Sequence, residues 1–412
     1  MRTLIITATI LVPTAASAGG YLIPSSDPRA LAVAQAAVAN EGGASAVSLN
    51  TAALAGQDGL DVAVAGEILN NRTEWSAPGL GTASLSETSV PPALGISYGR
   101  KLPNDQAWGI GIAFGAPAGG LLTWPAGWAG RESIQSVKQQ VVAFGAGAAF
   151  QLLPALKLGV SYAHLEASEE LHQSLNFLDH FGEAALGLAG GGNTFGVAAE
   201  VHVPKMPLSF GVTYSHSAEL GLSGRAHFTS VPESFQATIH DQDVTHKVLI
   251  PDVVFIGAAY EVMPHLTIMA AYDFEHWSSY KSDTFEGSDG FTVSVARNYK
   301  NAHVLRLGGE WKNLPVLPQL TVRAGILRSI SDQPSDTLSP SLTDASAWAP
   351  SIGAGFDVLS NLRVDLGYQH AFFDSVTATG MDALPGTYKT QVDLISLGVN
   401  YRNDLGMATP AK

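Results

Sequence analysis

The stretch Leu266-Thr267-Ile268-Met269-Ala270-Ala271-Tyr272-Asp273-Phe274-Glu275 decides the fold class, because its side chains alternate in character. Even-numbered positions are apolar up to Phe274, whereas the odd-numbered ones include Thr267, Asp273 and Glu275. Successive side chains of a β-strand point to opposite faces, so the stretch predicts a strand with one apolar and one polar face. The same alternation recurs at 156–163, 208–215 and 362–369.

Short and long connectors alternate between the strand-like stretches. The short connectors lie at 101–105, 152–155, 203–207, 262–265, 313–319 and 358–361. The long connectors lie at 72–84, 115–131, 167–192, 229–246, 282–290, 329–346 and 374–388. Short turns at one end and long loops at the other are typical of outer-membrane β-barrels.

We therefore expect an all-β fold, a transmembrane antiparallel β-barrel of about 14 strands with both barrel ends on the short-turn side. The expected strands span 59–71, 85–100, 106–115, 132–151, 155–166, 193–203, 207–228, 247–262, 265–281, 291–312, 319–328, 347–358, 361–373 and 388–402. A barrel of this size is too wide for its wall side chains to fill, so its lumen needs a plug.

A soluble β-sandwich would alternate in the same way, with its apolar face inward. Two features favour the membrane. The alternating stretches reach about ten residues or more, which suits tilted spanning strands. Aromatic residues also recur toward their ends, as interfacial girdles require, although burial in a core is the alternative. These aromatic residues are Trp108, Trp277, Trp311, Trp348, Tyr260 and Tyr401.

The composition agrees with a barrel wall and excludes several functions. Charged residues make up 14%, low against the roughly 25% of soluble domains, and there are 43 glycines. The formal net charge of −14 and the lack of a basic stretch argue against nucleic-acid binding. The absence of cysteine excludes disulfides and thiolate metal sites. No phosphate-binding or cofactor motif is present, so we expect no cofactor and no metal.

The first residues predict export. Arg2 precedes an apolar run at 4–12, and Ala16-Ser17-Ala18 forms a cleavage site for a signal peptide spanning 1–18. The apolar run is too short to cross a membrane as a helix, although a helical anchor is the alternative. The mature chain is expected to start near Gly19.

Residues 19–57 are the expected plug, or hatch, ahead of a barrel at 58–402 and a tail at 403–412. Asp27 is a helix N-cap followed by Pro28, and 30–39 predicts a short helix that Gly42-Gly43 ends. Many apolar and few charged residues argue against the alternative, a disordered arm.

The hatch carries a family resemblance. Asp27-Pro28-Arg29-Ala30-Leu31-Ala32-Val33-Ala34-Gln35-Ala36 and Ala44-Ser45-Ala46-Val47-Ser48-Leu49-Asn50-Thr51-Ala52-Ala53-Leu54 closely resemble the hatch of bacterial outer-membrane transporters for long-chain fatty acids and other hydrophobic compounds, the FadL/TodX-like family. The resemblance continues at 210–215, 249–252, 272–280 and 323–326, and covers nearly the whole mature chain.

Two positions depart from the family pattern. The hatch motif is usually Asn-Pro-Ala, whereas this chain has Asn50, Thr51 and Ala52, so the turn is expected to be looser. The terminal aromatic residue that the barrel-assembly machinery recognises corresponds to Tyr401, but a tail follows it here.

The resemblance implies passive uptake of hydrophobic molecules across the outer membrane, with three functional parts. Leu175, Phe177 and Phe181 would form an external capture groove, or pack together as a lid. Tyr21, Leu22 and Ile23 would line a lumen pocket beside the hatch. Gly115, Pro117, Gly119 and Gly120 would form a kink that opens the wall sideways, although 115–131 could instead be an extracellular loop.

Three inward-phase arginines have two possible partners. Arg306, Arg323 and Arg363 could bind a substrate carboxylate, because arginine pairs with it bidentately. The favoured alternative is that they pair with wall acids such as Glu310, Asp365 or Glu200.

Other functions stay open at this point. A barrel hydrolase would need a serine near one of His164, His216, His246 and His370, none of which lies in a nucleophile motif. A non-specific porin or an adhesin is the remaining alternative. We expect no enzyme, a monomer in contact with outer-membrane lipid, and a hydrophobic substrate that is a fatty acid or an aromatic hydrocarbon.

Overall fold

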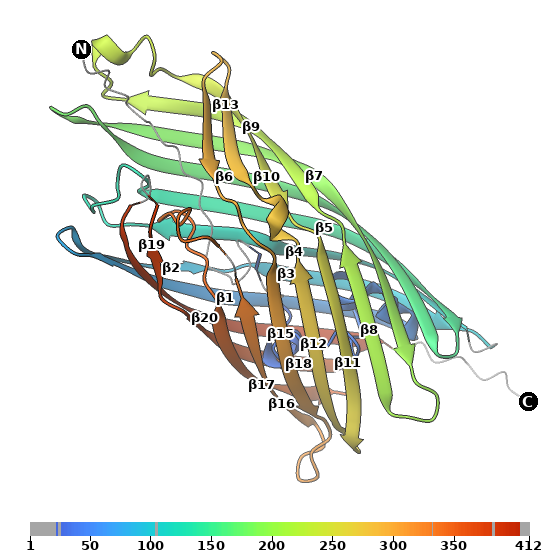
Figure 1. Ribbon diagram of the computed structural model, residues 1–412. Coiled ribbons are helices and arrows are strands. Elements are labelled where there is room, and N and C mark those ends of the chain that lie inside the picture. Colours follow the sequence, from blue (N-terminus) through green and yellow to red (C-terminus); the bar gives the residue numbers. More distant parts are fainter. Residues whose placement is uncertain (1–21, 24–25, 104–105, 332, 381–383, 404–412) are drawn as a thin grey trace, which may run out of the picture.

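The computed structural model describes residues 22–23, 26–103, 106–331, 333–380 and 384–403, and these form one closed barrel (Figure 1). A single antiparallel sheet of 20 strand segments closes because β1 (Gly59–Ala77) pairs with β20 (Gly386–Asn403). The ladder between them runs from Leu60 opposite Asn403 to Ser76 opposite Thr387. The expected antiparallel β-barrel is confirmed. The expected signal peptide lies outside the described residues, as does the tail from 404 onward.

The 20 segments combine into 14 wall strands, as expected, because six wall strands are each interrupted once. The interrupted strands are β2 (Gly81–Ser89) with β3 (Pro92–Lys101), β8 (Leu208–Ser215) with β9 (Ala218–Thr229), β10 (Gln242–Ile250) with β11 (Val253–Met263), β12 (Leu266–Glu275) with β13 (Ser282–Gly287), β14 (Thr292–Ala296) with β15 (Ala302–Trp311), and β18 (Leu362–Phe373) with β19 (Val376–Ala378). The uninterrupted strands, besides β1 and β20, are β4 (Ala107–Thr123), β5 (Ser136–Leu153), β6 (Leu156–Asn176), β7 (Phe181–His202), β16 (Leu320–Ile330) and β17 (Ala347–Leu359).

An apolar belt surrounds the part of the barrel that lies toward the short turns. Its side chains point outward and are exposed, for example Val160 at 58% and Ile352 at 61%. Exposed surface of this kind on an antiparallel barrel is what contact with lipid requires. Of the expected girdle residues, Tyr260, Trp311, Trp348 and Tyr401 are exposed, but Trp277 is buried. Trp277 begins a short 3₁₀ turn, η3 (Trp277–Ser279), and its indole nitrogen donates to Glu275 at 2.7 Å.

None of the helices in the described ranges is long and apolar enough to span a membrane.

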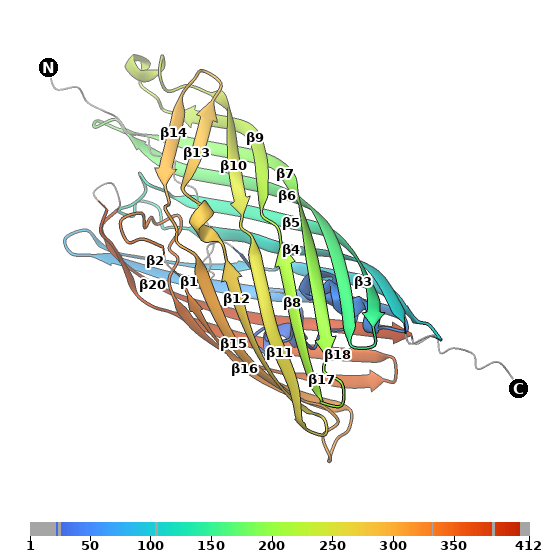
Figure 2. The ribbon, with the colours of Figure 1, turned by 45° about the vertical axis from the view of Figure 1, so that its right-hand side comes forward.

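Several strands continue well beyond the belt, where long loops were expected (Figure 2). The expected loop at 167–192 was wrong, because β6 and β7 pair from Leu156 opposite Val201 to Asn176 opposite Phe181. Likewise β1 and β2 pair as far as Ala77 opposite Gly81, inside the expected connector at 72–84.

Where these strands leave the belt, their apolar side chains change from the outward face to the inward face. On β6, Leu158, Val160 and Tyr162 are exposed, whereas Leu165 and the inward residues after it are buried and Glu166 and Glu170 are exposed. Apolar side chains thus point outward in the belt and inward above it. The upper wall therefore has the pattern of a water-soluble sheet and encloses its own apolar core.

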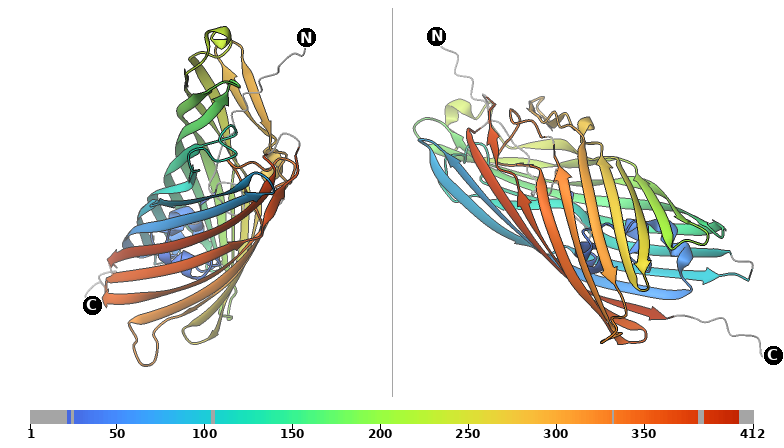
Figure 3. Two further views of the ribbon diagram at one scale, coloured as in Figure 1. Left: turned by 90° about the vertical axis from the view of Figure 1, so that its left-hand side faces the viewer. Right: turned by 60° about the horizontal axis from the view of Figure 1, so that its bottom comes forward.

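We call the end of the barrel with the short turns the lower end and the opposite end the upper end. The hatch lies inside the lower part of the barrel (Figure 3). It contains α1 (Pro28–Ala32), α2 (Ala46–Leu49) and the 3₁₀ helix η1 (Thr51–Gly56); a third 3₁₀ turn, η2 (Glu233–Phe235), lies in an upper loop. Asp27 accepts a hydrogen bond from the Ala30 N–H at 2.8 Å, as an N-cap does. The expected helix over 30–39 is wrong beyond Ala32, because Ala34 and Gln35 adopt the left-handed backbone with φ of 51° and 58°.

Wall glycines set how closely the hatch can approach. A Cβ added to Gly109 would lie 2.2 Å from the Leu54 carbonyl oxygen, and one on Gly211 would lie 2.3 Å from that of Val38. Comparable approaches occur at Gly95, Gly159, Gly308, Gly325 and Gly367. The hatch backbone therefore touches the wall backbone directly, around much of the circumference.

Substituting Gly109 by alanine should loosen the hatch. The new methyl group would force Leu54 to shift, and overpacking of this kind costs about 1–3 kcal/mol. The matched control is Gly66→Ala on β1, where an added Cβ meets nothing within 4 Å. The urea midpoint of unfolding in detergent micelles should fall for Gly109→Ala and stay near wild type for Gly66→Ala. Equal midpoints would show that the close contact does not set the fit.

Candidate functional site

The wall is irregular on β4. Gly115 lies opposite Ala143 and Ala118 opposite Val141, so β4 has one extra residue at this point. An extra residue in one strand is a β-bulge, which bends the strand and increases its twist. The expected kink residues Gly115, Pro117, Gly119 and Gly120 fall on and just after this bulge, and β4 continues to Thr123.

The ladder on one side of β4 ends at the bulge. β3 pairs with β4 from Lys101 opposite Ala107 to Leu94 opposite Phe114. β2 continues the same wall strand but pairs with β1, and no ladder joins β2 to β4 within the described ranges. Among the described residues, the wall therefore lacks backbone hydrogen bonds between β2 and β4 on the side of Phe114 that faces away from the short turns. We call this break in the hydrogen-bond ladder the wall opening; the term describes the missing backbone bonds, since side chains of β2 and β4 such as Leu85, Ala118 and Leu122 belong to one packed cluster.

The first described residues of the chain lie at the bulge. Leu22 forms an antiparallel bridge with Ala118, and the Ile23 N–H donates to the Pro117 carbonyl oxygen at 2.8 Å. Two of the expected lumen residues thus meet the expected kink. Tyr21 lies outside the described residues.

Ile23 also packs on an apolar sector of the lumen above the hatch. The sector combines Leu31 and Ala34 of the hatch with wall side chains from β1, β15, β16, β17, β18 and β20. These wall residues are Leu69, Val304, Leu327, Ala349, Ala371, Val392 and Leu394. Such a lining suits alkyl or aromatic ligands, because apolar surface gains about 25 cal/mol per Å² on leaving water.

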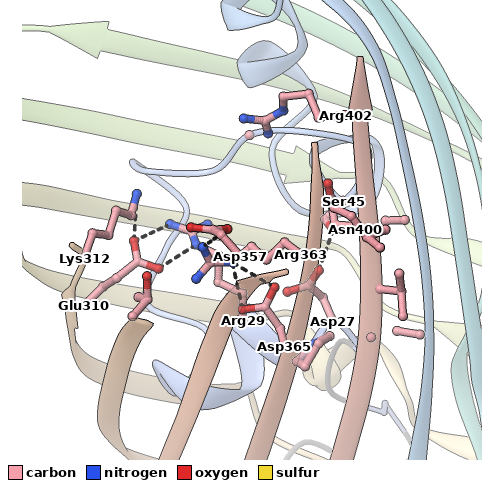
Figure 4. Close-up of a pocket in the computed structure, with 18 of the residues that line it drawn as sticks. Asp27, Arg29, Ser45, Glu310, Lys312, Asp357, Arg363, Asp365, Asn400 and Arg402 are labelled. Atoms are coloured by element: carbon pink, nitrogen blue, oxygen red, sulfur yellow. Dashed lines mark hydrogen bonds and ion pairs between the residues drawn. The ribbon is translucent and has the colours of Figure 1, made fainter. Parts of the chain in front are cut away.

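Below this sector, a chain of ion pairs ties the hatch to the wall (Figure 4). Arg29 Nε lies 3.0 Å from Glu310, Arg323 lies 2.7 Å from Glu310 and 2.6 Å from Asp365, and Arg363 lies 3.1 Å from Asp365. These residues line a cavity of about 470 Å³ that opens between hatch and wall. Burial raises the pKa of Glu41, a hatch residue at this cavity, to about 8, although its pairing with Arg29 at 3.3 Å opposes the rise.

All three expected lumen arginines pair with acids. Besides Arg323 and Arg363, Arg306 lies 2.5 Å from Asp273 and donates to the Ala34 carbonyl oxygen at 3.2 Å. Glu200, an expected partner, pairs instead with Lys157 at 2.9 Å. Contact of these arginines with a substrate stays a prediction. Arg29, which joins hatch and wall, was not singled out by sequence, although it follows the N-cap and proline of the hatch helix.

The hatch motif keeps its turn without proline. The Asn50 side chain accepts from the Ala52 N–H at 3.1 Å and donates to the Val38 carbonyl oxygen at 2.5 Å. Thr51 occupies the first position of η1, where a proline is tolerated because that N–H needs no helical partner. The Thr51 hydroxyl instead donates to the Val47 carbonyl oxygen at 3.4 Å.

The expected capture residues lie at the tip of the β6–β7 hairpin. Leu175 and Phe177 are buried in a small apolar cluster, in which the Phe177 ring lies 5.3 Å from Phe235. Phe181 is 44% exposed, and the Arg131 guanidinium lies 4.2 Å from its ring centroid. Leu178, an apolar residue at the tip of the same hairpin, is 81% exposed.

The histidines pair with groups other than serine. His164 lies 2.9 Å from Asn193, His216 lies 3.2 Å from Asp252, and His370 lies 2.6 Å from Asp393. His246 is buried and stacks on Phe285. Within the part of the chain that the structure describes, no serine hydroxyl bonds a histidine ring, and no cluster of three or more residues could hold a metal ion.

Sequence reasoning missed Glu67. It is fully buried on the lumen face of β1, and neither carboxyl oxygen has a hydrogen-bond partner among the described residues. The available signal was its phase, because Glu67 shares the inward face of β1 with the buried residues Leu69 and Trp75.

Comparisons with known proteins agree with this architecture. A family profile described as "Outer membrane protein transport protein (OMPP1/FadL/TodX)" matches residues 9–403. No protein with a curated description matches in sequence.

Solved structures share the fold. A FadL homologue from Pseudomonas aeruginosa has a TM-score of 0.83 at 18% identity, covering 94% of this chain and 100% of that one. The P. putida toluene transporter TodX has a TM-score of 0.68 at 16% identity, covering 91% and 98%. The Ralstonia pickettii toluene transporter TbuX has a TM-score of 0.65 at 16% identity, covering 96% and 100%.

Removing the cation that joins hatch and wall should destabilise the hatch. Arg29→Ala leaves the fully buried Glu310 with fewer partners, and loss of a hydrogen bond to a charged group costs about 2 kcal/mol. The control is Arg72→Ala, whose side chain is 58% exposed beside Asp393 and should contribute less than about 1 kcal/mol. Thermal unfolding and protease cleavage within the hatch should change for Arg29→Ala alone. Similar behaviour of both variants would contradict a role of Arg29 in holding the hatch.

Proposed function

Because the chain belongs to the outer membrane protein transport family, we propose that it carries hydrophobic molecules passively across a bacterial outer membrane. The observation that carries this proposal is the wall opening. The β3–β4 ladder ends at Phe114, and Leu22 and Ile23 bond the bulge just above it. An apolar lumen sector thus lies near a place where no ladder joins β2 to β4 in the described ranges, close to the exposed belt residue Phe144.

The proposed route has three steps. Exposed apolar side chains at the β6–β7 tip capture the molecule, a lumen site with Tyr21, Leu22 and Ile23 receives it, and the wall opening releases it sideways into the bilayer. Release into lipid is favoured over release into the periplasm, since exposing alkyl groups to water costs about 0.8 kcal/mol per CH₂. Transport then needs no energy source beyond the gradient.

Relatives indicate the general substrate class. TodX and TbuX carry the description of toluene transporters, and the P. aeruginosa structure that of a FadL homologue. We propose an alkyl or aromatic hydrophobe for this chain. The same proposal includes export by the 1–18 signal peptide and insertion by the barrel-assembly machinery. It also includes function as a monomer in outer-membrane lipid.

Deleting Ala116 should close the wall opening. The deletion removes the extra residue between Gly115 and Ala118, so that β4 can pair in regular register. Uptake of oleate or toluene by cells expressing the variant should fall at least about tenfold, because the ligand loses its exit. The matched control deletes Val262, the extra residue in the shift between Glu261 and Met263 on β11. Normal uptake by the Ala116 deletion, with a heat-modifiable barrel, would rule out lateral release.

The exposed tip of the β6–β7 hairpin should determine capture. Replacing Leu178 and Phe181 with serine removes two exposed anchors, which weakens capture by at most roughly tenfold because each is only partly covered by ligand. Initial uptake rates at low substrate concentration should fall, while saturating rates persist. The comparison variant replaces the buried pair Leu175 and Phe177. An effect confined to the buried pair would identify the hairpin tip as a lid.

A further inference from the structure

Glu67 lies at the height where the wall opens. Its N–H donates to the Pro91 carbonyl oxygen at 3.1 Å, and the preceding residue, Gly66, lies opposite Pro92. Pro92 in turn lies next to the bulge, since a Cβ added to Gly115 would be 3.8 Å from its carbonyl oxygen. The buried carboxyl group is therefore level with the lower end of the wall opening.

Two described residues near the N-terminus, Ile23 and Ser26, lie on two sides of Glu67. Ile23 bonds Pro117 at the bulge, and the Ser26 carbonyl oxygen accepts from the Ser396 hydroxyl at 2.5 Å. Ser396 lies directly opposite Glu67 in the β1–β20 ladder. A ligand that passes from the lumen to the opening between Ile23 and β1 would therefore come next to the carboxyl group.

Glu67 is a buried acid without a partner among the described residues. Its exposed fraction is 0%, both oxygens lack hydrogen bonds, and no ion pair reaches it from any residue that the structure describes. Burying such a group is costly unless something bonds it, and native proteins keep unsatisfied buried groups mainly where a ligand or water uses them.

The surroundings of Glu67 combine polar and apolar groups. Asn71 Nδ2 and Gln369 Nε2, on the same side of the lumen, are also buried and have no partner in the part of the chain that the structure describes. Leu69 and Leu394 lie between them, opposite each other in the β1–β20 ladder, and Ile23 packs on the same sector. The sector therefore complements a molecule that has a hydrocarbon part and a hydrogen-bonding group.

We propose that Glu67 binds the hydroxyl group of a hydrophobic alcohol or phenol, whose apolar part lies on Leu69 and Leu394. The inference rests on the proposed function and specifies its substrate class. A hydroxyl group can donate to the carboxyl oxygens, whereas a plain hydrocarbon leaves them unsatisfied. A carboxylate would meet an acid without a counter-ion, because Arg29, Arg306 and Arg323 are paired with other acids.

The test compares three ligands of equal chain length: decane, decanol and decanoate. Binding of each radiolabelled ligand to the full chain in amphipol is measured by equilibrium dialysis, with empty amphipol as background. Decanol should bind about tenfold more tightly than decane, since a hydrogen bond to a charged or buried group supplies roughly that factor. Glu67→Leu should abolish the difference.

Two further variants sharpen the result. Measured at pH 10, where an ionised Glu67 would repel decanoate, Glu67→Gln should keep the preference for decanol and strengthen decanoate binding, because it retains an acceptor and removes that charge. Glu74→Gln changes an exposed glutamate on the outer face of the same strand and should leave all three affinities unchanged. If Glu67→Leu does not form a heat-modifiable barrel, decanoate binding by Glu67→Gln decides.

The outcomes separate the inference from the proposed function. Equal binding of decane and decanol by the wild type, or a decanol preference that survives in Glu67→Leu, would overturn the role of Glu67 and leave hydrophobe transport intact. Unchanged decanoate binding in Glu67→Gln would overturn it as well. Failure of all three ligands to bind above background would overturn the proposed function itself.

Discussion

Backbone-to-backbone contact between hatch and wall is the constraint on which the rest of the structure depends. At Gly109, Gly211 and Gly308 the wall has no side chain, so carbonyl groups of the hatch lie where a Cβ would be. This close fit places α1 beneath the apolar sector and Arg29 beside Glu310. A wall with larger residues at these positions would exclude the hatch, and the lumen would be left open to water.

The ion pairs, together with the close fit, fix the position of the hatch in the barrel. Arg29, Glu310, Arg323 and Asp365 alternate in sign from hatch to wall, so each buried charge has an opposite neighbour within 3.0 Å. Such pairs contribute little net stability because desolvation offsets attraction, but breaking one leaves an uncompensated charge. They therefore fix the position of the hatch more than they stabilise the barrel. Glu67 lies outside this pattern, because it is buried and no cation among the described residues pairs with it, as expected of a group that binds a ligand.

Much of the architecture could be predicted from local sequence pattern. The alternation at 266–275 and the short connectors are local, and they were sufficient for the barrel and the 14 wall strands. The upper strands at 167–192 were missed because their apolar side chains change face, which looks like the end of a strand. The helix over 30–39 stops at Ala32 because of wall contacts that no local pattern contains. The burial of Glu67 depends on segments far apart in sequence.

The change of face on β6 also fixes its register twice. Below the change, Lys157 faces the lumen and Tyr162 faces outward; above it, Leu171 is buried and Glu170 faces water. A slip of one residue would turn every side chain to the other face, so Lys157 would enter lipid while Glu170 entered the core. Lipid around the lower part of the strand and water around its upper part therefore each oppose a slip of one residue. Every slip of this 21-residue strand by an odd number of residues is therefore opposed at both ends, which lets one continuous strand pass from membrane to water.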